Sequence, residues 1–365
     1  MINAYWLAWS QLSGIGSISL KRIYQHFGCL QAAWNAPVAD FNQIEGLNSK
    51  AIASIAQGRS PINPEKLLQD HLSQNPLFWT PQDPEYPRLL QEIPSPPALL
   101  YYRGQVQLKE NQGITPLVGI VGTRNPTEYG KRWTKKITTA LVKHGFGIVS
   151  GMAAGIDAVA HQSCLAAGGR TIAVLGTGVD TVYPYSNRQL YQQIEHQGLI
   201  VSEYPAKSKP EKGNFPARNR IIAGLCRAVL IMEAPERSGA LITARFANDF
   251  CRDVYVLPGS LDNVQAIGCL RLLNNGAQVI LSEEDLLEML GTMPQLDIHS
   301  AKVEPLPELE PELNSIFELI SSEPVSLDFI VEKTTINTGQ ILAYLSQLEL
   351  MGLVSQLPGM QYRRN

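Results

Sequence analysis

The feature that most constrains the fold of this chain is a regular alternation of short apolar runs and helical stretches after residue 116. Seven apolar runs of strand length lie at 117–121, 147–150, 171–175, 199–202, 227–232, 253–257 and 277–281. Helical stretches separate them, for example at 127–144, 155–167, 187–196 and 239–250. Strands that alternate with helices form a parallel sheet with helices on both faces. The sequence therefore predicts an α/β domain whose ligands gather at the carboxyl ends of the strands.

Further segments flank this domain. Residues 1–75 consist of short helical stretches, and the proline-rich stretch that follows favours an irregular lead-in over a helix. We take 76–290 as one domain that includes this lead-in. Prolines and acidic residues make 291–310 an extended linker. In 311–365, three helical stretches are followed by a short β-ribbon, which is the order of elements in a winged helix.

Two similar units occur in the first segment, at 12–23 and 44–55. In the first, a Gly-Ile-Gly turn precedes a helix that carries Lys21 and Arg22, and this pattern matches a helix-hairpin-helix that binds a DNA phosphate. The second unit has Asn48 where the second glycine is expected. Because the segment is not strongly basic, two hairpins that pack together without a ligand remain the alternative.

Composition narrows the class of protein. A formal net charge of −3 gives no overall basic field, so any polyanion site must be a local patch. Five scattered cysteines without a C-x-x-C pair argue against a disulfide framework and a zinc site. The N-terminus lacks the pattern of a signal peptide, and no apolar run reaches the roughly 18 residues of a membrane span. We expect a soluble cytoplasmic protein without a membrane anchor or a zinc site.

The turn after the first strand, Gly122-Thr123-Arg124, resembles the start of a dinucleotide site. It lacks the three glycines of G-x-G-x-x-G, and Arg124 stands where a dinucleotide needs bare backbone. Turns of this kind at helix N-termini present N–H groups and the positive end of the helix dipole to an anion. We therefore expect an anion other than a dinucleotide here.

Small residues also open the helix after the second strand, at 150–157. Its first three residues are Ser150, Gly151 and Met152. The loop after the third strand carries Tyr185 and Arg188. Because the carboxyl ends of parallel strands meet at one edge, these turns form a single rim that favours anions.

The loop after the fourth strand, 202–224, is the most basic part of this rim. Its cations are Lys207, Lys209, Lys212, Arg218 and Arg220, and they are opposed by Glu203 and Glu211. Tyr204 and Phe215 lie among them. Cations for phosphates beside aromatic faces for bases are typical of single-stranded nucleic-acid binding. A solvated loop, in which Arg218 and Arg220 only form salt bridges, is the alternative.

No catalytic constellation stands out. Asp157 and His161 are one helical turn apart, but no paired carboxylate or further ligand accompanies them, so we expect structural roles such as local hydrogen bonding at a helix N-terminus. Ser238 lies among small residues without a nearby histidine, which favours a capping role over a nucleophile. The G-x-S-x-G and P-loop motifs are absent from the sequence.

Four stretches together resemble the DNA-processing protein A family (DprA, also called Smf). They are "GIVGTRNPTEYG", "VSGMAAGIDAVAHQSCLAAGGRTIAVLGTGVDTVYP", "FPARNRIIAGLC" and "ERSGALITARFANDFCRDVYVLPG". "YPRLLQEIPSPPALLYYRG" resembles the lead-in to that family's Rossmann-like domain. The resemblance covers roughly 80–290 and is specific, because several long motifs occur in order.

This resemblance implies a binding protein without a cofactor rather than an enzyme. Members of the family bind single-stranded DNA and load the RecA recombinase onto strands covered by single-strand-binding protein. They act in natural transformation and are typically homodimers. The family's G-[ST]-R turn corresponds to Gly122, Thr123 and Arg124, which is then expected to hold a DNA phosphate.

Other family positions can be carried over one by one. The basic position before the F-P-x-R-N-R motif corresponds to Lys212. The motif itself corresponds to Phe215, Arg218, Asn219 and Arg220. Some members have Lys after the Tyr-Pro of the third loop, where this chain has Tyr185, and we expect Arg188 to compensate.

Two alternative functions remain open. A nucleoside-monophosphate-hydrolysing relative is the main competing interpretation, although its P-G-G-x-G-T-x-x-E motif is not present, and a structural adaptor for recombinases is another.

The winged-helix segment is acidic. Residues 301–365 hold four cations and nine acids, and the candidate recognition helix 337–352 has no Lys or Arg. We therefore expect the winged helix to contact a protein partner or to compete with DNA, and not to read DNA sequence.

Overall fold

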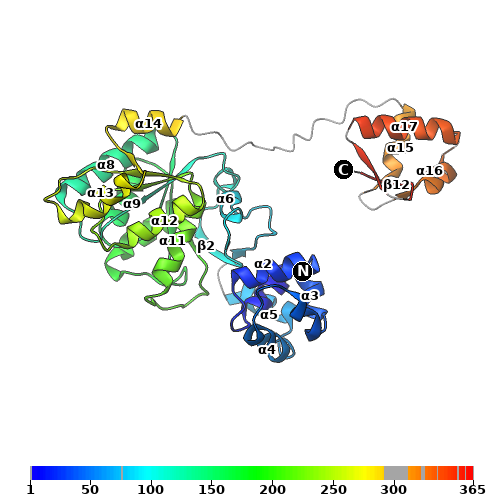
Figure 1. The fold of residues 1–365 in the computed structure, drawn as a ribbon, viewed down its shortest axis with the longest axis horizontal. Helices are drawn as coiled ribbons and strands as arrows, with labels where there is room; N and C mark the ends of the chain where they lie inside the picture. Colours follow the sequence, from blue (N-terminus) through cyan, green and yellow to red (C-terminus); the bar gives the residue numbers. More distant parts are fainter. Residues whose placement is uncertain are drawn as a thin grey trace. The chain divides into compact units, whose positions relative to one another are not determined.

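The computed structural model describes residues 2–74, 77–291, 311–321, 325–334, 336–351, 353–357 and 359–364. The chain divides into two compact units, one within 1–298 and one within 299–365 (Figure 1). The predicted boundary near residue 75 lies inside the larger unit and stays a prediction.

A mostly parallel sheet forms the centre of the larger unit. Within residues 77–291 it has nine strands in the order β1-β2-β6-β5-β4-β3-β7-β8-β9. The strands are β1 (Phe78–Trp79), β2 (Leu100–Gly104), β3 (Leu117–Val121), β4 (Gly147–Ser150), β5 (Thr171–Val174), β6 (Leu199–Ser202), β7 (Ala228–Ile231), β8 (Asp253–Val256) and β9 (Gln278–Val279). Strands β3 to β9 pair in parallel, whereas β1 and β2 extend one edge antiparallel. The α/β fold class predicted from the alternation is confirmed.

The continuous apolar runs are explained by burial on both faces of the sheet. All five residues of β3 are buried. Leu117 and Val121 belong to one hydrophobic core, while Val118 and Ile120 between them belong to another. A strand covered on both sides needs apolar side chains at every position, so it shows no polar alternation.

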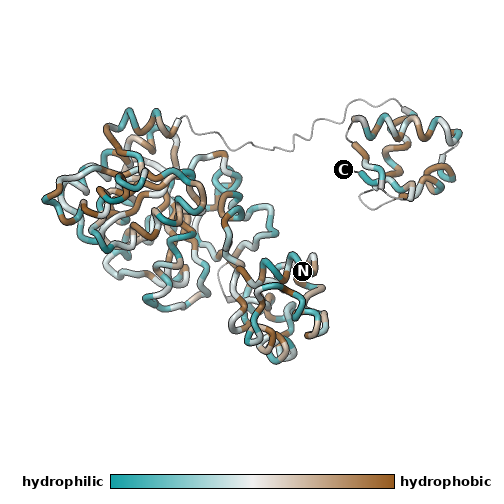
Figure 2. Tube along the Cα trace, viewed as in Figure 1, coloured by the Kyte–Doolittle hydropathy of each residue, from teal (hydrophilic) through white to brown (hydrophobic). Residues whose placement is uncertain are grey.

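Helices form a layer on each face of this sheet. They are α6 (Arg88–Gln91), α7 (Leu108–Asn111), α8 (Glu128–Lys143), α9 (Ile156–Ala166), α10 (Arg188–Gln197), α11 (Asn214–Leu225), α12 (Gly239–Asp249), α13 (Ile267–Asn274) and α14 (Glu283–Gly291). Apolar side chains of α11 and α12 pack on one face, and those of α8, α9 and α14 pack on the other. Figure 2 shows the apolar residues concentrated in the strands and the polar ones on the outer turns of the helices.

One assignment from the sequence is wrong: the stretch 202–224 is not a loop throughout, because α11 begins at Asn214. The last five residues of α11, Ile221 to Leu225, are buried against the sheet, together with Arg218 and Asn219. In the sequence, the basic and proline-rich residues at the start of the stretch resemble a loop, so the apolar helix face that follows them was not recognised. The motif residues Phe215, Arg218 and Arg220 therefore lie on the first turns of a rigid helix.

Residues 2–74 form α1 (Ile2–Ser10), α2 (Ser17–Phe27), α3 (Leu30–Asn35), η1 (Val38–Gln43), α4 (Ser49–Gly58) and α5 (Pro64–Gln74). Gly14 and Gly46 have φ of 78° and 76°, so each predicted unit does contain a glycine turn before its helix. Asn48 caps α4, since its Oδ1 accepts the Ala51 N–H at 2.9 Å. The guanidinium of Arg22 lies against Gly46, so the two units pack on each other. The packing agrees with that part of the alternative, and phosphate binding by the first unit stays a prediction.

The smaller unit has the predicted winged-helix order. Its described elements are α15 (Pro311–Leu319), β10 (Val325–Ser326), α16 (Leu327–Lys333), α17 (Thr338–Leu350), β11 (Val354–Leu357) and β12 (Gln361–Arg364). Strand β12 pairs with both β10 and β11. Arg364 is not free at the wing, because its guanidinium lies 3.9 Å from the Phe317 ring and donates to the Phe317 carbonyl. Arg363 remains exposed.

Candidate nucleic-acid interface

A cleft of about 560 Å³ opens at the carboxyl edge of the sheet. The chain runs from β3 outward to β6 on one side and then returns to place β7 on the other side of β3. Neighbouring strands whose connections leave in opposite directions create a crevice at the sheet edge, where α/β folds bind their ligands. The turn after β3 and the segment after β7 both line the cleft.

Seven of the twelve site residues predicted from the sequence line this cleft. They are Gly122, Thr123, Arg124, Lys212, Phe215, Arg218 and Asn219. Gly151 borders a small adjoining cavity of about 70 Å³, together with Arg124 and Phe215. Ser150, Met152, Arg188 and Arg220 line neither space.

Exposed cations and aromatic rings meet at the mouth of the cleft. The guanidinium carbon of Arg124 lies 5.9 Å from the centroid of the Phe215 ring. The Tyr183 and Phe215 rings have centroids 5.3 Å apart. Lys212 and Arg237 are exposed, so their charges face solvent at the same opening. This arrangement offers both a positive potential and apolar faces to a ligand.

A buried carboxylate of the chain itself occupies the N-terminus of α8. Glu233, 2% exposed, accepts the Thr127 N–H at 2.8 Å and the Thr127 hydroxyl at 2.6 Å. The Glu233 carbonyl accepts the Thr123 N–H at 2.7 Å. Thr127 in turn caps the helix by accepting the Gly130 N–H. The expectation that this turn offers free N–H groups to an external anion is therefore wrong for Thr123, whose N–H donates to the Glu233 carbonyl, and for Thr127, whose N–H donates to the Glu233 carboxylate.

Asp157 fills the equivalent position at the second turn. Its Oδ2 accepts the N–H groups of Gly151 at 3.1 Å and of Ala153 at 3.4 Å. Burial raises the pKa of Asp157, and the charge of Arg218 together with these N–H groups counters that rise. The structural role expected for Asp157 is confirmed. With both carboxylates in place, the N–H groups of Thr127, Gly151 and Ala153 are taken, whereas the exposed side chains of Arg124 and Lys212 are open to a ligand.

Arg218 lies in the floor of the cleft and not on its rim. The residue is 4% exposed, and its guanidinium donates to the carbonyls of Gly151, at 2.7 Å, and of Val174. Burial lowers the pKa of Arg218 to about 10, and Asp157 opposes this shift. Arg218 thus ties the ends of β4 and β5 together and supplies a buried positive charge beneath the cleft.

Several other predicted residues also serve the framework. The Ser150 hydroxyl is buried and donates to the Ile120 carbonyl at 2.6 Å. Met152 is buried at φ 61°, so its backbone makes a tight turn and its side chain enters the core. Asn219 donates from Nδ2 to the Gly239 carbonyl at 3.1 Å, which joins α11 to the start of α12. These contacts shape the walls of the cleft.

Arg220 and Arg188 are each held by a partner outside the cleft. Arg220 forms a bidentate ion pair with Glu203, at 2.6 and 2.7 Å, and donates from Nε to the Ser95 carbonyl. This matches the salt-bridge alternative for Arg220. Arg188 donates to the Tyr185 hydroxyl at 2.8 Å and stays exposed at the start of α10.

Sequence reasoning missed several cleft residues. Tyr183, Arg237 and Gly239 line the cleft but were not among the predicted site residues. The sequence could have indicated them, since Tyr183 follows β5 whereas Arg237 and Gly239 follow β7, and both strands end at the same edge of the sheet. Ser238, also in the cleft, accepts the Ala240 N–H at 3.2 Å, so its expected capping role is confirmed.

The described residues also bear on two other classes of site, metal centres and membrane spans. Within that part of the chain, no three His, Cys, Asp or Glu side chains are grouped to hold a metal ion. None of the helices there combines the length and the apolarity needed to cross a bilayer.

Comparisons with known proteins bear on both units. Residues 77–291 match the model of the family described as DNA recombination-mediator protein A, and residues 300–360 match the DprA winged helix domain. Protein Smf of Synechocystis sp. is 54% identical, over 99% of this chain and 98% of that protein.

Solved structures are also similar. DNA processing protein A of Streptococcus pneumoniae has a TM-score of 0.69 at 35% identity, covering 78% of this chain and 97% of that one. DNA processing protein A of Helicobacter pylori, solved to show its single-stranded DNA binding mode, has a TM-score of 0.53 at 34% identity. That comparison covers 59% of this chain and 96% of the other.

Proposed function

The chain belongs to the DNA recombination-mediator protein A family (DprA/Smf), and from this premise we propose that it binds single-stranded DNA without sequence preference in the cleft between β3 and β7. We further propose that it loads RecA onto the bound strand, as a cytoplasmic homodimer, in homologous recombination and natural transformation. Family membership supports this second part, and the geometry of the cleft supports the first.

One observation carries the proposal for DNA binding: the cleft presents cationic and aromatic side chains, while carboxylates of the chain itself already accept N–H groups of the turns after β3 and β4. Glu233 and Asp157 take the N–H groups that a dinucleotide pyrophosphate would need. Arg124 and Lys212 remain exposed at the opening, beside Phe215. Separate cations on flexible side chains suit the spaced phosphates of a strand better than one compact pyrophosphate.

The ring pair supports the proposed lack of sequence preference. The Phe215 and Tyr183 rings can stack with any base, because every base has an aromatic face. The Asn219 amide, one of the groups that could read a base edge, donates instead to the Gly239 carbonyl. Stacking and charge therefore account for affinity in this cleft, and hydrogen bonding to base edges contributes little.

Titration of a fluorescent oligonucleotide at several salt concentrations tests the site. Each phosphate neutralised on a single strand contributes about 0.7 to the slope of log K against log salt. Arg124→Ala and Lys212→Ala should each reduce the slope by about that amount. Lys109→Ala, at an exposed lysine on α7, is the matched control and should leave the slope unchanged. If both cleft variants bind like the wild type while folded, the site is elsewhere.

RecA loading needs its own assay. RecA filament formation on DNA covered by single-strand-binding protein should be faster with the wild type than without it, and Arg124→Ala should reduce the gain. A DNA-binding protein that gives no gain would contradict the loading proposal alone. A nucleoside-monophosphate hydrolysis assay in parallel tests the enzyme alternative, since turnover that Arg124→Ala abolishes would favour a nucleotide site.

A further inference from the structure

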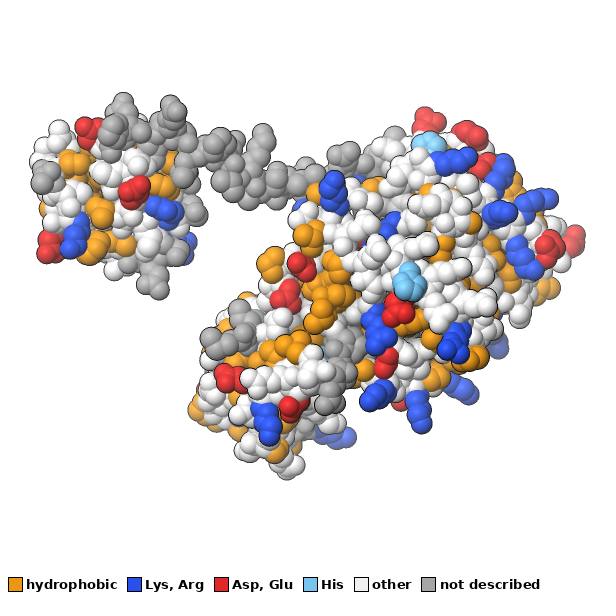
Figure 3. All heavy atoms as spheres, turned by 180° about the vertical axis from the view of Figure 1, so that it is seen from behind, with side chains coloured by type: hydrophobic (Ala, Val, Ile, Leu, Met, Phe, Trp, Pro, Cys, Tyr) orange, Lys and Arg blue, Asp and Glu red, His pale blue; other side chains and the backbone are white. Residues whose placement is uncertain are grey.

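Helix α8 is a second basic surface, outside the cleft. It carries five cations, Lys131, Arg132, Lys135, Lys136 and Lys143, and a single acid, Glu128. Its net charge of +4 contrasts with −3 for the whole chain. Figure 3 shows the molecule from behind the view of Figure 1, and Lys and Arg side chains gather there on the right of the larger unit. This is the side of α8, which Figure 1 draws on the left. Neither the cleft nor the packing of the helix accounts for this concentration of charge.

The buried face of α8 explains only its apolar and small residues. Gly130, Thr134, Ile137, Thr138 and Leu141 face the core at helical spacing. The cations lie on the opposite face, and all five are exposed. A solvated helix normally mixes both signs of charge, so a row of one sign indicates a polyanionic ligand.

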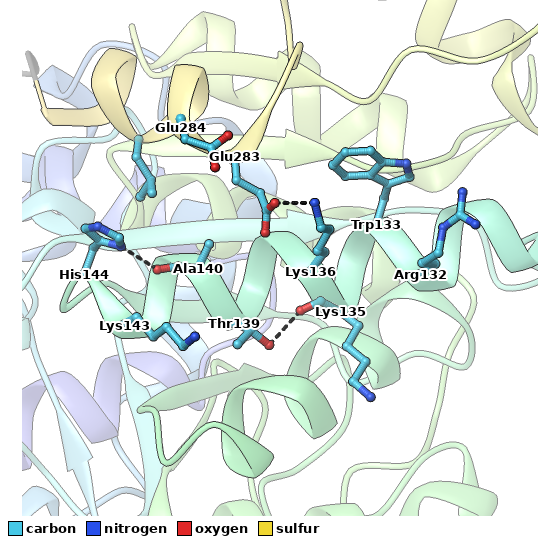
Figure 4. A pocket seen from close by; sticks show the side chains of 11 residues that line it. Arg132, Trp133, Lys135, Lys136, Thr139, Ala140, Lys143, His144, Glu283 and Glu284 are labelled. Atoms are coloured by element: carbon cyan, nitrogen blue, oxygen red, sulfur yellow. Dashed lines mark hydrogen bonds and ion pairs between the residues drawn. The ribbon is translucent and has the colours of Figure 1, made fainter.

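A groove of about 980 Å³ runs along this face, between α8 and the start of α14. Arg132, Lys135, Lys136 and Lys143 line one wall (Figure 4). Glu283 and Glu284 line the other, and Glu283 is paired with Lys136 at 2.5 Å. Figure 4 shows the Lys135 side chain extending away from this pair. The α8 wall thus keeps the charges of Arg132, Lys135 and Lys143 beside the Lys136–Glu283 pair. Because Glu283 and Glu284 repel an anion, a bound anion is confined to the α8 wall.

The groove is linked to the cleft by a continuous line of cations. A depression of about 470 Å³ has both Arg124 and Lys131 in its wall, and Arg124 also lines the cleft. Lys131 and Lys135 are four residues apart, so they are neighbours on the helix surface. Lys131 pairs with Glu128 at 2.8 Å, but both side chains are largely exposed and such a pair exchanges readily for a phosphate.

From this continuity we propose that a DNA strand leaving the cleft past Arg124 runs along α8, with its phosphates bound by Lys131, Lys135 and Lys143. The twelve helical steps from Lys131 to Lys143 span about 18 Å at 1.5 Å per step. A stacked strand places a phosphate about every 3.4 Å, so the row covers about five phosphates. The inference rests on the proposed DNA binding in the cleft and adds a second, length-dependent part to it.

An acidic protein segment is the competing occupant. It is less favoured because Trp133, the largest apolar side chain in the groove, is half-buried and covered by the Lys136 ammonium at 4.9 Å from its ring. A protein interface would place an uncovered apolar anchor at its centre.

The test compares oligothymidines of about 6 and about 20 nucleotides, since a single-strand-binding domain such as an OB-fold takes roughly 4–16 nucleotides. The variant is Lys135→Gln with Lys143→Gln in the full-length protein. The matched control is Lys66→Gln with Lys109→Gln, two exposed lysines on α5 and α7. We expect the α8 variant to bind the long strand 5- to 10-fold more weakly at low salt, with a slope reduced by about 1.4 for two phosphates. Binding of the short strand should not change.

The outcomes separate the two proposals. Equal losses on both lengths, or no loss on the long strand, overturn the inference while leaving the cleft in place. If the wild type binds neither length, the proposed function fails first and the inference fails with it. Polyglutamate that binds the wild type and not the α8 variant, with long-strand binding unchanged, would assign the groove to an acidic protein partner instead.

Discussion

Replacing Glu233 by alanine should destabilise the larger unit and open an anion site at the N-terminus of α8. The substitution removes three hydrogen bonds to a buried carboxylate: two from Thr127 and one from Asn263, at 3.2 Å. Hydrogen bonds to charged groups contribute about 1.5–3 kcal/mol each, and the effects of neighbours do not add fully. We therefore expect a loss of about 4 kcal/mol in the free energy of unfolding, or about 8–16 °C in Tm for a domain of this size.

The same substitution leaves the Thr127 N–H and the positive end of α8 without their anion. Phosphate should bind there and recover part of the stability, because a ligand that binds only the folded state raises Tm. The assay is thermal melting of the wild type and the variant in phosphate and in chloride of equal ionic strength. Phosphate should raise the Tm of Glu233→Ala relative to chloride and leave the wild type nearly unchanged.

Glu236→Ala is the control, since Glu236 lies three residues away, is exposed and pairs with Arg271 on the surface. Surface pairs contribute less than about 1 kcal/mol, so its Tm should change little. Equal Tm changes for the two variants, or no difference between phosphate and chloride for Glu233→Ala, would refute the view that Glu233 acts as a built-in anion.

Three further predictions concern stacking, pH and the smaller unit. Phe215→Ala should weaken single-strand binding by about 1–3 kcal/mol without changing its salt slope, measured by the same titration; a changed slope would contradict stacking. Burial lowers the pKa of His161 to about 3 from 6.5, so the unfolded chain binds the extra proton between these values. The free energy of unfolding of the wild type should thus fall by about 1.4 kcal/mol per pH unit below 6.5. Urea titrations at several pH values measure this, and His161→Gln should give a shallower dependence of the free energy of unfolding on pH. Parallel pH dependences for the two proteins would count against this prediction. Removing residues 305–365 should leave DNA affinity equal or higher in the same titration, and a large loss would show that the winged helix binds DNA.

Much of the fold follows from local sequence pattern. Strand β3 could be placed from five consecutive apolar residues, and its parallel pairing from the helix that follows. The winged helix could be recognised from the order of its elements. Helix α11 was missed because its basic start resembles a loop, although Ile221 and Ile222 supply a buried face.

For the site, the sequence alone determined which loops share the carboxyl edge of the sheet, and so placed Arg124, Lys212 and Phe215 at one cleft. Only the tertiary structure decided which polar groups are open to a ligand. Glu233 lies 106 residues from Thr127 in the chain, and Arg218 lies 67 residues from Gly151, so no local spacing reveals either contact. Buried polar groups must find partners wherever the fold brings them, and here those partners are the backbone N–H and carbonyl groups of the predicted anion-binding turns.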